Sequence, residues 1–306
     1  MTSQDGRLVM VTGGSGFIGS NLVDTLLDRG FRVRVIDNFS SGNRAQLDPR
    51  ADLVKADVRD LQSIAPAFAG VDCVFHTAAL PRVPLSIKRP VETHMVNVIG
   101  SLNVLIAARD HGVRRVVYSG SSSVYGEQSC LPLTESMCPN PLSPYALQKL
   151  TSEQYTRIFH RLHGIETLTL RYFNVFGPRM ATEGAYVTVI AVFLLARSSR
   201  SELTIHGDGE QTRDFTHVSD VVRANLLAMD CAVADGRAIN IGQGRNVSVN
   251  RIAEIVGGPK VYLPPRPGEP RHTLADRSEA ERVLGWHPHV TVEAGLQELL
   301  NADGLR

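Results

Sequence analysis

The stretch VTGGSGFIGS constrains the fold of this chain more than any other part of its sequence. It follows an apolar run, LVMVT, and spaces Gly13, Gly16 and Gly19 evenly at the start of an amphipathic segment. Small residues at a strand-to-helix junction permit a tight turn, let the backbone approach a diphosphate, and let the helix pack on the strand. The free N–H groups at the helix N-terminus attract the anion. The stretch therefore predicts a dinucleotide-binding turn.

Short apolar runs alternate with amphipathic segments of helical length from Leu8 to Arg171. The β-rich runs are LVMVT, RVRVID, DLVKA, CVFHTAA, RRVVYSG and TLTLRYF. This alternation predicts an α/β fold with a doubly wound parallel Rossmann sheet. After Arg171 the elements become shorter and richer in Gly, Pro and Arg. We expect a Rossmann domain over residues 1–171 and a smaller C-terminal α/β substrate lobe over residues 172–306, with segments that can interleave with the first domain.

Charge and cysteine usage narrow the class of protein. The formal net charge of +1 gives no overall footprint for nucleic acid or an anionic membrane, so neither is an expected partner. The run VTVIAVFLLA is about ten residues long, whereas a membrane span needs roughly 20, and it predicts a buried helix. The four cysteines and ten histidines show no metal-ligand spacing, so we expect no metal site. Scattered cysteines and a start without a secretory pattern predict a cytoplasmic protein.

Two carboxylates follow predicted strands. Asp37 in VIDN lies about 20 residues beyond the glycine turn, where it can bond the adenosine ribose hydroxyls and repel a 2′-phosphate, so it favours NAD over NADP. Asp57 in KADVRD can meet the adenine amino group together with the Val58 backbone. The alternative for Asp57 is a capping or turn role. His76 in FHTAA is expected to pack near the cofactor pocket and not to bind a metal.

SPYALQK places Tyr145 and Lys149 at positions i and i+4, so both project from one face of a helix. A phenol has a pKa of about 10 and needs a shift of roughly 3 units to act as a base near neutrality. A neighbouring ammonium and the positive nicotinamide ring can supply that shift. In a chain without a dinucleotide turn, such a Tyr/Lys pair would be interpreted as part of an ordinary helix face. Because this chain has the turn, the pair predicts a proton-transfer site.

Several motifs in order carry a family resemblance. The glycine spacing, ADVRD, HTAA and the Tyr-x-x-x-Lys pair together resemble the extended short-chain dehydrogenase/reductase family over nearly the whole chain. RYFNVFGPR, GDGEQTRDFTHVSD, NIG and RPGEPRHTLAD resemble its nucleotide-sugar epimerase and dehydratase branch. The resemblance implies tightly held NAD, with Lys149 holding the nicotinamide ribose. It also implies cofactor contacts from Phe17, Ile18, Asn38, Ala78 and Asn97.

YSGSSSVYG puts three serines at the carboxyl end of a predicted strand, the edge at which ligands bind in this architecture. By resemblance, Ser121 matches the catalytic Ser/Thr of the epimerases and Ser123 a second, often hydroxylated position, while Ser122 is expected to be structural. The sugar 4,6-dehydratases carry an Asp-Glu pair where this chain has Ser122 and Ser123. The UDP-glucuronate decarboxylases usually carry a Glu at the second of these positions. The chain has the groups for reversible oxidation and lacks these groups for elimination.

The resemblance implies a UDP-hexose 4-epimerase that works through a 4-keto sugar. Asn174 would contact the diphosphate, Arg213 and Arg266 the phosphates, and Glu269 the uridine ribose. Thr273 borders the substituent on sugar C2 in such enzymes, and its small size, together with the Glu183 to Ile190 segment, favours N-acetylated as well as plain UDP-hexoses. In a rival interpretation, a UDP-glucuronate 4-epimerase, Arg179 would pair with the sugar carboxylate. A second rival is a non-catalytic NAD-binding regulatory protein.

The resemblance also implies a homodimer built from the segments Val91 to Asp110 and Ser143 to His163. Val91, Met95, Val98, Leu102 and Leu105 recur at three- and four-residue steps, as a buried helical stripe does. The alternative is that this stripe faces only the sheet of its own chain.

Overall fold

The computed structural model describes residues 6–181, 188–265 and 270–302 of the chain. Its centre is a seven-stranded sheet, parallel at every pairing, in the order β11-β6-β5-β4-β1-β2-β3. The strands are β1 (Leu8–Thr12), β2 (Arg32–Asp37), β3 (Asp52–Lys55), β4 (Cys73–His76), β5 (Arg115–Ser121), β6 (Glu166–Tyr172) and β11 (Asp235–Ile241). The predicted doubly wound α/β architecture is confirmed. The strand order switches direction between β1 and β4, the point at which such sheets bind ligands.

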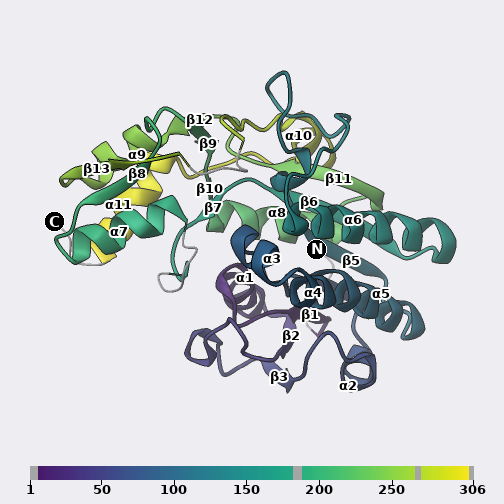
Figure 1. Cartoon of the computed structure of the whole chain (residues 1–306). Helices are drawn as coiled ribbons and strands as arrows, with labels where there is room; N and C mark the ends of the chain where they lie inside the picture. The colour runs from purple at the N-terminus through teal and green to yellow at the C-terminus, as the bar shows by residue number, and fades with distance from the viewer. Residues whose placement is uncertain (1–5, 182–187, 266–269, 303–306) are drawn as a thin grey trace.

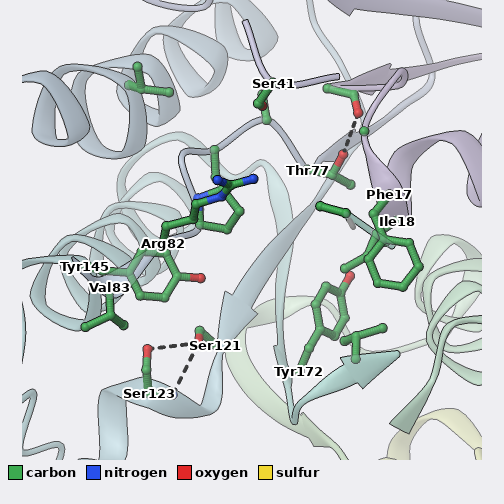
Figure 2. Close-up of a pocket in the computed structure, with 18 of the residues that line it drawn as sticks. Phe17, Ile18, Ser41, Thr77, Arg82, Val83, Ser121, Ser123, Tyr145 and Tyr172 are labelled. Atoms are coloured by element: carbon green, nitrogen blue, oxygen red, sulfur yellow. Dashed lines mark hydrogen bonds between the residues drawn. The ribbon is translucent and has the colours of Figure 1, made fainter. Parts of the chain in front are cut away.

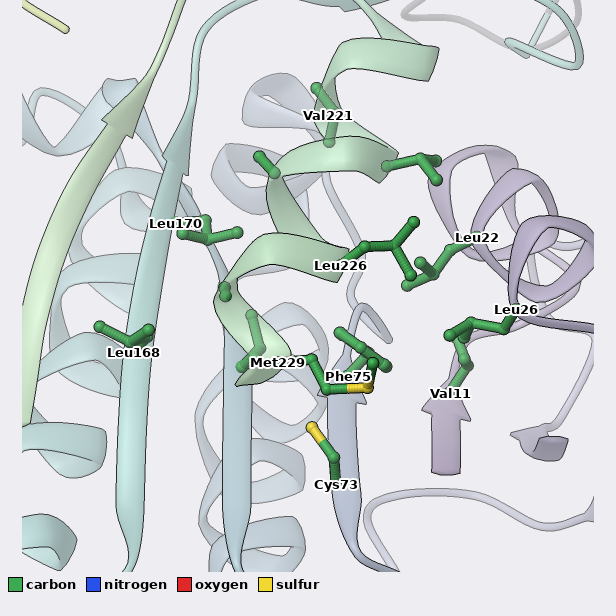
Figure 3. Packing of buried hydrophobic residues seen from close by; sticks show 14 of the residues in the cluster. Val11, Leu22, Leu26, Cys73, Phe75, Leu168, Leu170, Val221, Leu226 and Met229 are labelled. Carbon is green, nitrogen blue, oxygen red and sulfur yellow. The ribbon is translucent and has the colours of Figure 1, made fainter. Parts of the chain in front are cut away.

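One face of the sheet is covered by α1 (Phe17–Asp28), α8 (Val218–Asp230) and α10 (Ser278–Leu284). Figure 3 shows Leu22 and Leu26 of α1 meeting Leu226 of α8 beside Val11, with Met229 close to Phe75. Alternation along β1 explains this packing, because Val9 and Val11 face this cluster while Leu8 and Met10 face the opposite one. Both α8 and β11 lie after residue 171 in the chain, yet they complete this central layer.

The other face is covered by α2 (Leu61–Ile64), η2 (Ala65–Phe68), α5 (Gly100–Asp110) and α6 (Pro144–His163). Ser143 caps α6 by accepting a hydrogen bond from the Ala146 N–H, and Pro144 occupies its first position. Gly164 ends the helix with φ 71°, a conformation that favours glycine. The N-terminal cap fixes where α6 begins, and so where Tyr145 lies.

Ahead of α5 the chain forms α3 (Val83–Lys88), α4 (Pro90–His94) and a π-helical turn, η3 (Met95–Ile99), which continues into α5. The continuous helix Pro90–Asp110 is long and apolar enough to cross a membrane, and no other helix among the described residues is. In its most apolar window 56% is buried inside the fold. A core helix of a folded domain passes the same test of length and composition.

A second lobe lies beside the carboxyl edge of the sheet (Figure 1). Its core gathers Ile190, Phe193, Ile205, Phe215 and Ile252, all buried. The run predicted as a buried helix forms α7 (Val189–Ser198). The remaining elements are β7 (Val175–Phe176), β8 (Leu203–His206), β9 (Thr212–Asp214), β10 (Thr216–His217), β12 (Asn246–Ser248), α9 (Val249–Val256), β13 (Lys260–Leu263) and α11 (Val292–Ala302).

Candidate active site

A cavity of about 560 Å³ opens at the carboxyl edge of the sheet, where β1, β2, β4 and β5 end. It is lined by the glycine turn, the serine run and the start of α6, and on its far side by residues of the second lobe. Of the predicted site residues, its walls contain Gly13, Gly16, Phe17, Ile18, Gly19, Asp37, Asn38, Asp57, Val58, Ala78, Ser121, Ser123, Tyr145, Asn174, Arg213 and Thr273. The fold therefore brings most of the predicted site together.

The glycine turn has no room for side chains. Gly13 has φ 72°, and a Cβ there would lie 2.8 Å from the Ala78 backbone. A Cβ on Gly19 would lie 2.2 Å from the Gly13 carbonyl oxygen. Helix α1 starts directly after this turn, so its first N–H groups lie at the cavity. The geometry fits a dinucleotide diphosphate, which needs close backbone approach and a helix N-terminus.

Asp37 and Asp57 form the adenosine end of the cavity. Asp37 is buried and accepts hydrogen bonds from the backbone N–H groups of Ser15, at 2.9 Å, and Phe39, at 2.7 Å, so it also holds the glycine turn against β2. Hydrogen bonding from the Arg59 side chain lowers the pKa of Asp57 to about 2, which keeps it ionised. Asn38 donates to Asp57 at 2.7 Å. Asp37 on this wall fits the ribose hydroxyls of NAD and repels a 2′-phosphate, and Asp57 lines the same end, where the adenine amino group is expected.

The serine run sits where β5 ends. Ser121 caps the short helix η4 (Ser122–Tyr125), accepting from the Ser123 N–H at 3.2 Å, and the two side-chain oxygens lie 2.9 Å apart. Figure 2 shows this pair beside the Tyr145 ring, on the side of the cavity opposite Phe17 and Tyr172. Ser122 also lines the cavity. A hydroxyl pair beside a phenol can share or pass a proton.

Tyr145 and Lys149 are both buried, and burial opposes the charged form of each. Burial raises the pKa of Tyr145 to about 12, and hydrogen bonding to Ser121 lowers it only in part. Burial also lowers the pKa of Lys149 to about 7. The lowering of the phenol pKa predicted from the sequence is therefore not supplied by the side chains alone. A positive nicotinamide ring beside Tyr145 would supply it.

Three predicted residues are not among the described residues that line the cavity. Lys149 Nζ instead donates to the Ser119 carbonyl at 2.8 Å and lies 5.0 Å from the centre of the Tyr118 ring. Asn97 holds the Leu80 backbone, with Oδ1 accepting from its N–H at 2.8 Å. Arg179 pairs with Asp24 at 2.6 Å. Asn97 thus supports the cavity wall from outside the cavity, and the Arg179 guanidinium is held by its ion pair to Asp24 of α1.

The second lobe contributes a further cavity, also of about 560 Å³. Asn174 and Arg213 line both cavities, so the two adjoin. Asn174 has φ 27°, and its Nδ2 donates to the Asp214 carbonyl at 3.2 Å. Thr273 is buried, and its N–H donates to the Thr212 carbonyl at 3.2 Å. Arg266, Glu269 and most of the Glu183 to Ile190 segment lie outside the described residues.

His76 is buried between two hydroxyls, with Nδ1 2.7 Å from Thr12 Oγ1 and Nε2 2.9 Å from Ser101 Oγ. Burial lowers its pKa to about 3, so the ring is neutral. It packs behind the cofactor pocket and joins β1, β4 and α5. Over the described ranges no group of three or more His, Cys, Asp or Glu side chains could hold a metal ion.

Arg82 was not among the sequence predictions, yet it lines the cavity beside Val83. Figure 2 shows its guanidinium reaching toward the space between Tyr145 and Ser41. The sequence signal was the LPRVP segment directly after HTAA, since that segment leaves β4 at the ligand-binding edge. A cation on this wall favours anionic ligands.

Comparison with known proteins gives one family. The profile of the NAD dependent epimerase/dehydratase family matches residues 9–242. The chain is similar to the UDP-glucose 4-epimerase of Thermotoga maritima, solved with UDP-glucose, at 38% identity and a TM-score of 0.91, covering 95% of this chain and 96% of that one. It is similar to a UDP-N-acetylglucosamine 4-epimerase of Methanobrevibacter ruminantium in complex with UDP-N-acetylmuramic acid, at 36% identity and a TM-score of 0.92, with 97% and 98% covered. It is also similar to the UDP-glucuronic acid 4-epimerase of Bacillus cereus in complex with UDP-glucuronic acid and NAD, at 31% identity and a TM-score of 0.88, with 97% and 99% covered.

Proposed function

This chain belongs to the NAD dependent epimerase/dehydratase family, and on that premise we propose that it inverts C4 of a UDP-hexose through a 4-keto sugar. The observation that carries the proposal is the Ser121, Ser123 and Tyr145 cluster, which lies in one cavity with the dinucleotide turn. A second cavity adjoins the first. The positions at which dehydratases carry an Asp-Glu pair hold Ser122 and Ser123. Proton transfer and reversible oxidation are supported, and elimination is not.

Each group of residues around the cavity has its own role in the proposed reaction. The glycine turn, Asp37 and Asp57 hold NAD, which when bound accepts a hydride from sugar C4 and returns it. Tyr145 takes the C4 hydroxyl proton and later gives it back. Ser121 holds the same oxygen and shares the proton, with Ser123 fixing the Ser121 hydroxyl at 2.9 Å. Lys149 braces the β5 end through the Ser119 carbonyl and contributes positive charge beneath the site.

The second cavity is proposed to hold the uridine diphosphate. Asn174 and Arg213 lie where the two cavities join, which suits a diphosphate between a nucleoside and a sugar. Arg266 and Glu269 remain proposed contacts to phosphate and uridine ribose. In this division the NAD layer corresponds to residues 1–171 with α8, β11 and α10 returning to it, and the substrate lobe to the rest of residues 172–306.

A panel of UDP-sugars tests the function. UDP-glucose, UDP-galactose, their N-acetylated analogues and UDP-glucuronate are each incubated with the NAD-loaded protein, and the products are separated by chromatography. We expect C4-inverted products from the first four. No turnover of any sugar by a protein that still holds NAD would support a regulatory role instead.

The rival substrate, UDP-glucuronate, depends on a free cation for the sugar carboxylate. Arg179 was the candidate, but its guanidinium pairs with Asp24, and Asn21 of the same helix donates to the Pro178 carbonyl at 3.2 Å. This pairing disfavours Arg179 as the partner of the sugar carboxylate, while Arg82 also brings a cation to the cavity wall. Conversion of UDP-glucuronate in preference to UDP-glucose would favour the UDP-glucuronate 4-epimerase over the UDP-hexose 4-epimerase.

Comparing Ser121→Ala with Ser123→Ala identifies the reacting hydroxyl. We expect kcat to fall about 10- to 100-fold in Ser121→Ala, the value of one hydrogen bond to a charged group. Ser123→Ala should lose less, because Ser123 acts on the substrate only through Ser121. Steady-state kcat for both variants decides the matter. A larger loss in Ser123→Ala would exchange the two roles.

We further propose a homodimer formed through α4, η3 and α6. The predicted stripe does not form one face: Val98 and Leu105 are buried against the sheet, whereas Val91 is 75% and Met95 39% exposed. Leu147 and Leu162 on α6 are 54% and 72% exposed. Gln148 Nε2 donates to Thr93 Oγ1 at 3.0 Å and joins the two helices, so their outer faces are adjacent. Apolar side chains gathered on adjacent helices favour a second copy as occupant.

Light scattering at micromolar concentration is expected to give twice the mass of one chain. Val91→Glu should convert the protein to a monomer, because it places a charge in the proposed interface. Leu131→Glu alters an apolar side chain that is 39% exposed elsewhere, and it should leave the dimer intact. A monomeric wild-type protein would reject the interface.

We propose that the enzyme works in the cytoplasm. All four cysteines are unpaired, although Cys130 and Cys138 are exposed, which suits a reducing compartment.

A further inference from the structure

A buried polar network lies behind the serine turn. Arg171 on β6 pairs with Glu153 on α6 through two hydrogen bonds, Nε to Oε2 at 2.9 Å and Nη2 to Oε1 at 2.6 Å. The two side chains are 4% and 6% exposed. The remaining Arg171 nitrogen, Nη1, donates to the Tyr125 hydroxyl at 2.7 Å. The pair is thus tied to the turn that carries the catalytic serines.

Tyr125 extends the network to β11. Its hydroxyl donates to Asn240 Oδ1 at 2.7 Å, and burial raises the pKa of Tyr125 to about 12, so this proton is retained at neutral pH. Asn240 Nδ2 donates to the carbonyls of Leu133, at 2.9 Å, and Asp276, at 3.3 Å. The Arg171, Tyr125 and Asn240 side chains thus form an unbroken chain of hydrogen bonds. Such an arrangement allows one geometry only.

The positions of these residues connect three parts of the proposed site. Tyr125 belongs to η4, the same short helix as Ser123. Glu153 lies one turn after Lys149 on the helix that carries Tyr145. Asp276 follows shortly after Thr273, which lines the cavity from the second lobe. One network therefore spans the serine turn, the catalytic helix and the Thr273 segment.

We propose that Tyr125 is a positioning residue of the proposed epimerase, which holds the Ser121 and Ser123 hydroxyls against Tyr145 through Arg171, Glu153 and Asn240. A buried ion pair seldom adds net stability over apolar side chains of the same size. Its contribution here is geometric, since Arg171 bonds the catalytic helix on one side and the serine turn on the other. The expected effect on turnover rests on the proposed function. The positioning of the serine turn by Tyr125 does not.

The consequence is a change at Tyr145. Hydrogen bonding to Ser121 lowers the pKa of Tyr145 against the effect of burial. If the serine turn is released, that hydrogen bond weakens and the phenol becomes a poorer acid. The charged groups nearest to it, Lys149 on its own helix and Arg82 on the facing wall, are unchanged by a substitution at Tyr125.

The test is Tyr125→Phe, which removes one oxygen and both of its hydrogen bonds. At pH 7 we expect kcat of the NAD-loaded enzyme to fall at least about tenfold with KM for the UDP-sugar within twofold, and the loss to shrink toward pH 9. Thr167→Val is the matched control. Thr167 Oγ1 donates to the Thr156 carbonyl at 3.0 Å, another buried bond between β6 and α6, but far from the serines along β6. Its kcat should stay within twofold of wild type at every pH.

A titration separates this inference from the proposed function. The ultraviolet difference between each protein and its Tyr145→Phe counterpart follows the Tyr145 phenolate without turnover. We expect the midpoint to rise by about one pH unit in Tyr125→Phe, the size of one hydrogen bond. Asn240→Leu removes the Tyr125–Asn240 hydrogen bond from its other end, so it should shift the midpoint in the same direction and serves if Tyr125→Phe does not fold.

An unshifted midpoint, or equal losses of kcat in Tyr125→Phe and Thr167→Val, would overturn the positioning role. A shifted midpoint in a protein that converts no UDP-sugar would retain the positioning role and reject the epimerase.

Discussion

Tyr145→Phe is expected to lower turnover by about a thousandfold while the protein keeps its NAD, because proton transfer by a positioned side chain contributes 10²- to 10⁴-fold. The substitution removes one oxygen from a buried ring and leaves the backbone contact of Tyr145, from its N–H to Ser86 Oγ at 3.0 Å, in place. The glycine turn and the two carboxylates of the adenosine end are on other elements. Cofactor binding should therefore be unaffected.

The measurement has two parts. Product chromatography gives the rate, and cofactor released on denaturation gives the NAD content. Tyr262→Phe is the control, since it removes an exposed phenol on β13 whose hydroxyl donates to Asn250. An active Tyr145→Phe enzyme would remove Tyr145 from the mechanism.

Thr273→Tyr is expected to slow conversion of the N-acetylated UDP-hexoses strongly, while UDP-glucose and UDP-galactose are still converted. Thr273 is 7% exposed and lines the cavity, so a phenol ring there must occupy space inside it. Overpacking costs about 1–3 kcal/mol, or about 5- to 150-fold in rate, and the cost falls on the substrate with the bulkier C2 substituent. The ratio of kcat/KM for the two pairs of sugars reports the effect.

Thr273→Ser serves as the control for this prediction, because it keeps a hydroxyl at the site and takes up less space. Both pairs of sugars should be converted at close to the wild-type ratio. A wild-type enzyme that converts UDP-glucose but ignores the acetamido sugars would show that Thr273 does not set the limit.

The central sheet could be predicted from the sequence because its strands are local signals. Both faces are covered, so each strand is a short apolar run between turn residues, and LVMVT, RVRVID and CVFHTAA correspond to β1, β2 and β4. Strand β11 was harder, since Asp235–Ile241 follows a long excursion into the second lobe before it pairs with β6. Pairing between distant segments is a tertiary property that local patterns do not encode.

In the candidate site, too, residues of local motifs could be predicted from the sequence, whereas contacts between distant segments could not. Gly13, Asp37 and Tyr145 were found because each belongs to a short local motif whose residue types and spacing indicate its role. The pairing of Arg179 with Asp24 joins residues 155 positions apart, and nothing near either residue signals it. Asn97 was assigned to the cofactor, but its amide bonds the Leu80 backbone and Gln148 behind the wall. Which side of a wall a polar group faces is decided by packing.

The join between the two cavities has a kinetic consequence. Asn174, Val175, Thr188, Arg213 and Pro270 belong to both walls, so a nucleotide anchored in one cavity keeps its attached sugar within reach of the other. The linkage acts as a tether, and a short flexible tether gives an effective concentration in the millimolar range. A sugar that leaves the hydroxyls can thus turn and return many times before the nucleotide dissociates. In the proposed arrangement, the contacts to the nucleotide determine affinity, and the walls around the sugar determine selectivity. Affinity and selectivity can therefore change independently.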